Sequence, residues 1–78
     1  MGKTIERMRA NPKADWQISD VQKACREAGV RCTNPGSGSH YQIGNPGSML
    51  KLTIPARRPI RPVYIVKLVK YLDQEGVQ

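Results

Sequence analysis

The chain has 78 residues, two cysteines, one histidine and a formal net charge of +7. This length allows one small domain. The cysteines are too few for the disulfide framework of a small secreted protein, and with a single histidine they do not complete a four-ligand zinc site. The first residues contain no apolar signal segment, and no apolar run reaches membrane-spanning length. We therefore expect a cytoplasmic protein with reduced thiols, no metal or cofactor, and no membrane partner.

The positive charge is concentrated in one part of the sequence. Residues 28–72 contain seven Lys or Arg and no Asp or Glu, whereas residues 1–27 contain six Lys or Arg and four Asp or Glu. A one-sided basic surface favours a polyanionic partner, most often a nucleic acid. An acidic protein partner is a second explanation for this charge.

Residues 1–17 are expected to form an N-terminal extension to a domain at residues 18–75. Thr4 to Ala10 is predicted to be a short helix, because the Asn-Pro pair that follows disfavours the helical conformation. The connector after it contains Trp16, the only tryptophan. We expect Trp16 to anchor the connector by packing, and stacking on a nucleic-acid base is the alternative.

The first long helix is predicted to begin at Ser19. Ser19 and Gln22 fit a capping box, in which the serine accepts from an early helix amide and the glutamine reaches back to the serine amide. Asp20 adds negative charge at the positive end of the helix. Gly29 is placed to end it in the left-handed conformation. Its apolar face follows helical spacing and comprises Val21, Ala24, Cys25 and Ala28.

Three strands are predicted after this helix, at residues 30–33, 39–43 and 49–54. Each segment alternates between two kinds of side chain and is bounded by turn-forming residues. The connection between the second and third strands is short and contains Gly and Pro. It therefore predicts an antiparallel hairpin.

The alternation of side chains assigns the strand residues to two faces. His40, Gln42, Lys51 and Thr53 are expected on a face that is left to solvent or ligand. The opposite face is expected to cover the core with Tyr41, Ile43, Leu50, Leu52 and Ile54.

A proline-punctuated connector with three arginines, residues 55–62, leads to a last helix from Val63 to about Asp73. Pro62 suits the first turn of a helix, although the β-branched residues that follow also fit a strand. The core face of this helix is expected to comprise Ile65, Leu68, Val69 and Leu72.

The last helix is apolar on more than one face. A helix of this kind is usually enclosed between two layers. Either another chain covers it, or the N-terminal segment folds over it through Ile5, Met8 and Trp16. The apolar residues partly off the core face are Val63, Tyr64, Val66 and Tyr71.

These elements define an α+β fold with the order α-β-β-β-α and a short additional helix at the N-terminus. The three-stranded antiparallel sheet is expected to carry its helices on one face. This is the layout of double-stranded-RNA-binding domains (dsRBDs), which recognise shape and phosphate.

A glycine-rich loop precedes the second strand and delivers His40 to its start. Glycines let the backbone approach a ligand, and the amides of Gly36 and Gly38 are suited to hold a phosphate. An imidazole takes or gives a proton near neutral pH. An ordinary histidine in a turn is the alternative interpretation.

Five features follow one another in the chain: a helix ending at Gly29, Ser39-His40 after a glycine, Thr53-Ile54-Pro55 at a strand end, Ile60-Arg61-Pro62, and Val63 to Lys67. In this order, over about residues 18–73, they resemble the HicA-type toxins of bacterial toxin–antitoxin systems. The resemblance implies a dsRBD-like fold and a metal-independent endoribonuclease, an mRNA interferase that inhibits translation. It also implies neutralisation by a HicB-type antitoxin.

The resemblance also implies roles for particular residues. The family's catalytic histidine follows a glycine and a serine and corresponds to His40, which would act as the general base on the attacking 2′-hydroxyl. The antitoxin is expected to cover the His40 face or the surface at Tyr64 and Val66. Contacts to RNA are expected from Gly36, Gly38, Ser39, Lys51, Arg57, Arg58 and Arg61.

The general acid is left open by the sequence. Many members of the family have a second histidine where this chain has Tyr41, and a further one where this chain reads Ala56 to Arg58. Tyr41, the same imidazole, or water would serve. Two other functions are alternatives: a non-catalytic dsRBD-like RNA-binding module, and an interaction protein whose basic face binds only an acidic partner.

Overall fold

The computed structural model describes residues 2–34, 38–45, 47, 49–56 and 59–75. The elements in this part of the chain are α1 (Lys3–Ala10), α2 (Ile18–Ala28), β1 (Cys32–Thr33), β2 (His40–Ile43), β3 (Leu52–Pro55) and α3 (Pro62–Glu75). The protein is α+β, and the predicted order of elements, with its short leading helix, is confirmed. No helix within the described residues is long and apolar enough to cross a membrane.

The strands form one antiparallel sheet in the order β1-β2-β3. β2 pairs with β1 on one side, and on the other side it pairs with β3, where His40 lies opposite Pro55. The predicted hairpin is confirmed. β3 has a strand on one side only in the described part of the chain, and α3 packs over it on the covered face of the sheet.

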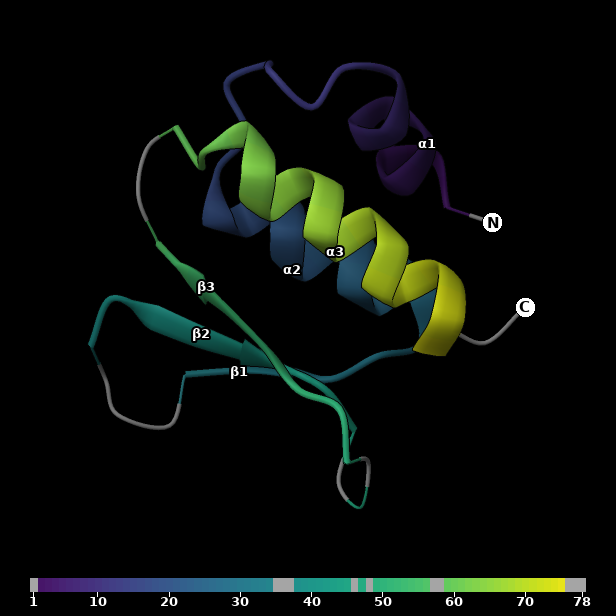
Figure 1. Cartoon of the computed structure of the whole chain (residues 1–78), viewed down its shortest axis with the longest axis vertical. Helices are drawn as coiled ribbons and strands as arrows, with labels where there is room; N and C mark the ends of the chain where they lie inside the picture. Colours follow the sequence, from purple (N-terminus) through teal and green to yellow (C-terminus); the bar gives the residue numbers. More distant parts are fainter. Residues whose placement is uncertain (1, 35–37, 46, 48, 57–58, 76–78) are drawn as a thin grey trace.

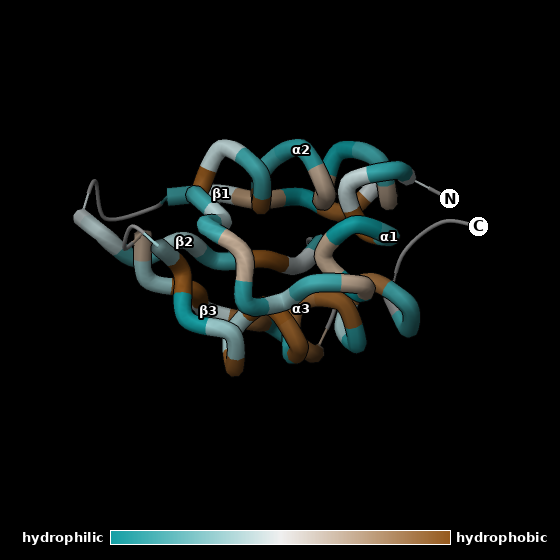
Figure 2. The backbone as a smooth tube through the Cα atoms, turned by 90° about the horizontal axis from the view of Figure 1, so that it is seen from above, coloured by the Kyte–Doolittle hydropathy of each residue, from teal (hydrophilic) through white to brown (hydrophobic). Residues whose placement is uncertain are grey.

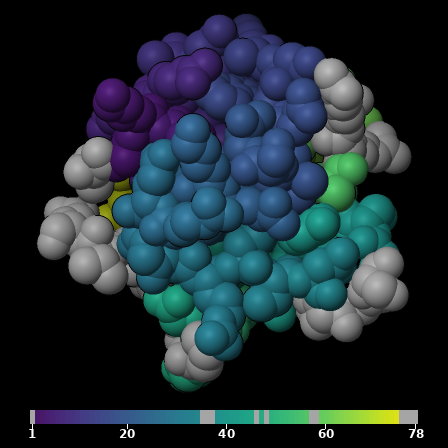
Figure 3. All heavy atoms as spheres, turned by 180° about the vertical axis from the view of Figure 1, so that it is seen from behind, coloured from purple at the N-terminus to yellow at the C-terminus, as the bar shows by residue number. Residues whose placement is uncertain are grey.

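The molecule has three layers (Figure 1). α2 and α3 lie side by side over one face of the sheet, and α1 crosses both on the side away from the sheet (Figures 1 and 2). In Figure 2, brown hydrophobic segments recur along α3, which lies between the sheet and α1. From behind, α1 and α2 cover the upper part of the surface, and the first strands cover the lower part (Figure 3).

The side-chain faces of β2 are as predicted. His40 and Gln42 are exposed, Ile43 is fully buried, and Tyr41 is half-buried. The face that carries Ile43 packs under α2 and α3, as strand alternation requires. His40 therefore stands on the solvent side of the sheet.

The prediction that Leu50 lies on the core face of a strand is wrong. β3 begins only at Leu52, and 56% of Leu50 is exposed. The reason lies in the neighbouring turn. Gly44 adopts a φ of 154°, the β2–β3 register ends at Ile43 opposite Leu52, and the carbonyl of Leu50 accepts from the Tyr71 hydroxyl of α3. A positive φ of this kind favours glycine.

The N-cap of α2 also differs from the prediction. The N-cap is Gln17, two residues before the expected cap Ser19, and Asp20 is the third helical residue. The Gln17 amide donates to Oδ2 of Asp20 at 3.0 Å, which completes a capping box with the carboxylate in place of Gln22. Ser19 lies inside the first turn. Gly29 ends the helix with a φ of 72°, as predicted.

The N-terminal segment covers α3, which confirms one of the two alternatives for its second apolar face. Ile5 and Met8 of α1 are completely buried, and each stabilises the fold by about 1.5–3 kcal/mol on the usual scale for apolar side chains. Val63 and Val66 of α3 remain about half exposed. The predicted core face of α3 is confirmed at Ile65, Leu68, Val69 and Leu72.

Trp16 serves as the packing anchor of the connector. Its ring is buried, its Nε1 donates to the carbonyl of Asn11 at 2.8 Å, and its own carbonyl accepts from the amide of Ile60 at 2.8 Å. The indole is thus buried and bonded to Asn11, and it is not available for stacking on a base. Through Ile60 it also fixes the approach of the chain to α3.

Candidate functional site

The predicted catalytic histidine borders a cavity at one end of the sheet. His40 is the first residue of β2 and lies opposite Pro55, the last residue of β3. The start of α3 adds Arg61 and Tyr64 to the same cavity, which has a volume of about 320 Å³. The start of β2, the end of β3 and the start of α3 therefore meet at this cavity.

Backbone hydrogen bonds hold His40 in this position. The carbonyl of Ser39 accepts from the amide of Ala56, which extends the β2–β3 ladder past His40. The carbonyl of Gly38 accepts from Nδ2 of Asn34 at 3.0 Å, which ties the incoming loop to the end of β1. The imidazole is exposed, and these two hydrogen bonds fix the backbone that leads to it.

Arg61 is positioned by the start of α3. Its carbonyl accepts from the amides of Tyr64 at 3.0 Å and Ile65 at 3.3 Å, so Arg61 stands where the helix begins. The preceding residue, Ile60, is fully buried and bonded to the carbonyl of Trp16. The backbone of Arg61 is thus fixed where α3 begins, and its side chain lines the cavity from that position.

The cavity favours an anion. Among the described residues, its lining contains one arginine and no carboxylate, and the amino-terminal end of a helix adds partial positive charge. Within the described part of the chain, no carboxylate forms an ion pair with Arg61. The cation is therefore available to a negatively charged ligand beside His40.

The structure brings some of the predicted site residues together and separates others. His40 and Arg61 share the cavity. Gly38 and Ser39 are exposed and directly precede His40, the first residue of β2. Lys51 lies at the other end of β3, where it lines a different cavity with Lys67 and Lys70. Gly36, Arg57 and Arg58 lie outside the described residues.

The two residues predicted to bind a protein partner lie on different sides of α3. Tyr64 is half-buried in the His40 cavity. Val66 is half exposed and borders a hollow of about 140 Å³ with Met8 and Pro12 of the N-terminal segment. Residues two positions apart on a helix do not share a face, so these side chains belong to two surfaces.

Tyr64 is the cavity residue whose place beside His40 the sequence analysis missed. The spacing from Arg61 was the available signal, because residues three apart lie on one face of a helix. Tyr41, a predicted candidate for the general acid, follows His40 directly and therefore points to the opposite face of the sheet. It does not line the cavity.

The two cysteines are neighbours, and both are free thiols. The Cys25 thiol donates a hydrogen bond to the Cys32 sulfur. This bond, together with burial, raises the pKa of Cys25, and the same bond lowers the pKa of Cys32 against the opposing effect of burial. Cys32 borders a cavity of about 320 Å³ with Arg26 and Val30. No cluster of three or more His, Cys, Asp or Glu suited to a metal occurs among the residues that the structure describes.

Comparison with protein-family models, curated proteins and solved structures finds no match to this chain.

Proposed function

We propose that the protein is an endoribonuclease, a toxin of the HicA type with a dsRBD-like domain, which cleaves mRNA and thereby inhibits translation. One observation carries the proposal: an exposed histidine, an arginine without a carboxylate partner among the described residues, and a tyrosine surround one cavity. These side chains can supply a general base, a cation for the transition-state charge and a proton donor for phosphodiester cleavage in RNA.

In the proposed reaction, the ribose 2′-oxygen attacks the adjacent phosphorus while a nitrogen of His40 accepts the 2′-hydroxyl proton. A positioned general base of this kind accelerates a reaction by about 10²–10⁴-fold. The bond from phosphorus to the 5′-oxygen breaks, which leaves a 2′,3′-cyclic phosphate on one fragment and a 5′-hydroxyl on the other. His40 suits this role because its side chain is exposed on a strand whose backbone is fixed.

Arg61 and Tyr64 complete the proposed site. Arg61 stabilises the negative charge that builds up on the phosphoryl oxygens in the transition state. The Tyr64 hydroxyl donates the proton that the departing 5′-oxygen takes up. This assignment is supported by the position of Tyr64 in the cavity and by the position of Tyr41 on the opposite face of the sheet. The steps need no metal ion.

The proposal includes a protein inhibitor, a HicB-type antitoxin, and action in the cytoplasm. The basic segment at residues 28–72 suits an acidic inhibitor, because opposite charges accelerate association at low salt. An inhibitor that covers the His40 cavity would exclude RNA from it directly. The half-exposed apolar side chains of Val63 and Val66 on the neighbouring helix provide further area for contact.

The test is to incubate a long RNA with the purified protein and with His40→Ala. Gln42→Ala is the matched control, since Gln42 lies two residues further on the same exposed face and does not line the cavity. We expect cleavage by the wild type and by Gln42→Ala, and none by His40→Ala. If the RNA stays intact with all three proteins and is equally retarded on a gel, the protein is a non-catalytic RNA-binding module and the nuclease proposal is wrong.

A further inference from the structure

A second positively charged cavity lies at the opposite end of β3 from His40. It has a volume of about 280 Å³, and its lining includes Lys51 before β3 together with Lys67 and Lys70 of α3. Leu50, Leu52 and Tyr71 supply apolar surface between the lysines. No Asp or Glu is among its described lining residues. We call it the lysine cavity.

The wall of the lysine cavity is held by specific contacts. The Tyr71 hydroxyl donates to the carbonyl of Leu50 at 2.6 Å, which fixes the start of the β3 segment against α3. A Cβ at Gly44 would lie 2.6 Å from Cδ of Lys51 and 3.0 Å from the Tyr71 hydroxyl. Only glycine therefore leaves room for both side chains. Lys51 Nζ donates to the carbonyl of Asn45, which directs this ammonium group.

The lysine cavity and the His40 cavity lie along one line. Both are bounded by β3 and α3: Pro55 and Tyr64 border the first, and Leu52 and Lys67 border the second. Figure 1 shows β3 running beside α3 over this distance, with no further strand between them. Along the helix axis, Tyr64 and Lys70 are separated by about 9 Å, from a rise of 1.5 Å per residue. One flexible polymer can reach both cavities.

We propose that the lysine cavity binds the phosphates and bases of a single-stranded RNA whose cleavage point lies at His40. This inference rests on the proposed function and adds to it the path of the RNA beyond the scissile bond. Lysines bind successive phosphates as point charges, and apolar side chains accept base faces without sequence preference. A single RNA strand presents both groups in alternation, as the wall of the lysine cavity does.

An acidic protein segment is the competing ligand for a basic and apolar cavity. The alignment with His40 favours RNA, because a polymer held beside the catalytic residue must pass along one side of it or the other. Lys67 and Lys70 continue the line of cations from Arg61 along α3, and Lys51 faces them from the segment before β3. Binding there would hold the RNA in place while the bond at His40 is cut.

The experiment measures binding of a single-stranded RNA with 2′-O-methyl sugars, which resist cleavage, and of about 12 nucleotides, within the usual range of such sites. The test variant is Lys51→Gln/Lys67→Gln/Lys70→Gln. The matched control, Lys3→Gln/Lys13→Gln/Lys23→Gln, removes the same charge from exposed lysines that do not line either cavity. Affinity is determined between about 0.05 and 0.2 M salt.

We expect the cavity variant to bind more weakly and its salt dependence to become shallower by about 2 in the log–log slope, from about 0.7 per phosphate contact on a single strand. The control variant should keep the wild-type slope. Replacement of the same three lysines by arginine should retain binding, because the charge is kept. Circular dichroism is expected to show unchanged helix content in all variants.

Equal affinity and slope in the cavity and control variants would overturn the proposal. If the cavity variant bound RNA like the wild type but lost binding to polyglutamate, the cavity would belong to an acidic protein segment. Cleavage of unmodified RNA separates the two levels of inference. Wild-type cleavage with no effect of the cavity substitutions contradicts the RNA path alone, whereas a wild type that neither binds nor cleaves RNA contradicts the proposed function as well.

Discussion

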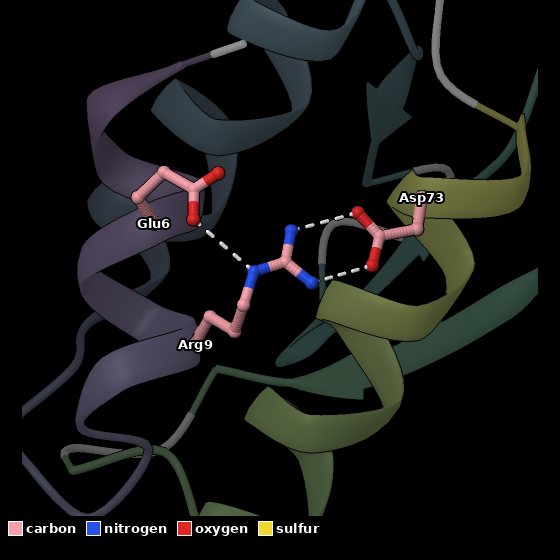
Figure 4. A network of polar contacts seen from close by, with 3 residues as sticks. All are labelled: Glu6, Arg9 and Asp73. Atoms are coloured by element: carbon pink, nitrogen blue, oxygen red, sulfur yellow. Dashed lines mark hydrogen bonds and ion pairs between the residues drawn. The ribbon is translucent and has the colours of Figure 1, made fainter.

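An arginine lies beside each end of α3, and the two arginines have different surroundings. Near the C-terminal end, Arg9 of α1 forms a bidentate pair with Asp73, at 2.7 and 2.9 Å, and its Nε donates to Glu6 at 3.2 Å (Figure 4). Near the N-terminal end, Arg61 lines the His40 cavity and forms no ion pair with a described carboxylate. The two arginines carry the same charge, but only Arg61 is available to bind a negatively charged ligand.

The difference separates cations that hold the fold from cations that can hold a ligand. The carboxylates of Asp73 and Glu6 raise the pKa of Arg9, and Arg9 lowers that of Asp73. These groups attach α1 to α3. Arg61 is fixed through its backbone, so its side chain keeps its charge and hydrogen-bond donors for another molecule. The net charge of the chain alone does not reveal this division.

The largest effect is expected from breaking the apolar contact between α1 and α3. Met8→Ala removes a fully buried side chain and should lower the free energy of unfolding by about 2–5 kcal/mol, because the cavity left behind is only partly filled. The matched change Val66→Ala, at a half-exposed position on α3, should cost well under half as much. Urea unfolding measures both, and equal losses would contradict the assignment of Met8 to the core.

The two arginines should respond in opposite ways to removal. Arg61→Ala is expected to reduce RNA cleavage by about 10²–10³-fold, the usual effect of deleting one group that stabilises transition-state charge. Arg9→Ala should leave cleavage unchanged, because Arg9 lies at the far end of α3. Initial rates on the same RNA measure the comparison. A similar loss in both variants would point to general charge and not to position.

Tyr64→Phe sharpens the assignment of the His40 cavity. The ring and its packing are kept, and only the hydroxyl is lost, so binding of the uncleavable RNA should be unchanged. Cleavage should fall by about 10²-fold if the hydroxyl is the general acid. Tyr41→Phe is the control on the opposite face of the sheet. Full activity of Tyr64→Phe would assign the proton to water or to the imidazole.

The cysteine pair predicts selective alkylation. The hydrogen bond from Cys25 holds the pKa of Cys32 below its ordinary value of 9.0, and Cys32 is partly exposed. Iodoacetamide should therefore modify Cys32 first, with a pH midpoint below 9, while the buried Cys25, whose pKa is raised, reacts only on unfolding. Peptide mass spectrometry locates the label. First modification at Cys25 would reverse the assignment of donor and acceptor.

The smallest effect is expected at the exposed ion pair. Arg9 lowers the pKa of Asp73 below its ordinary value of 3.8, so the pair contributes stability above that value and loses it as the pH falls through the lower, folded-state pKa. Asp73→Asn should be slightly less stable than the wild type at neutral pH, with the difference vanishing in acid. Thermal unfolding at several pH values measures this. A difference that grows in acid would contradict the pairing.

The local patterns in the sequence were sufficient for the faces of β2 and the core face of α3. Their spacing alone places His40 outside and Leu68 inside, because each pattern matches the period of its own element. The cap of α2 was mispredicted because serine is a preferred N-cap residue, which favoured Ser19. In the structure, the Asp20 carboxylate accepts from the Gln17 backbone amide, and Gln17 is the N-cap.

The candidate site was only partly predictable, because its members come from separate segments. His40 and Arg61 were found through the loop and the charge of the sequence. The position of Tyr64 beside them depends on how α3 packs against β3, which no local pattern contains. Lys51 was expected near His40 from its strand face alone, but it lies at the far end of β3, one residue before the strand begins.

The start of α1 depends on a residue that is made later. The Thr4 amide and hydroxyl donate to the two carboxylate oxygens of Glu27 in α2, at 3.0 and 2.8 Å. A helix of eight residues is hardly stable by itself. During synthesis on the ribosome, α1 therefore emerges before its anchoring carboxylate and before α3, which covers Met8. The docking of α1 is therefore complete only once Glu27 and α3 have been made.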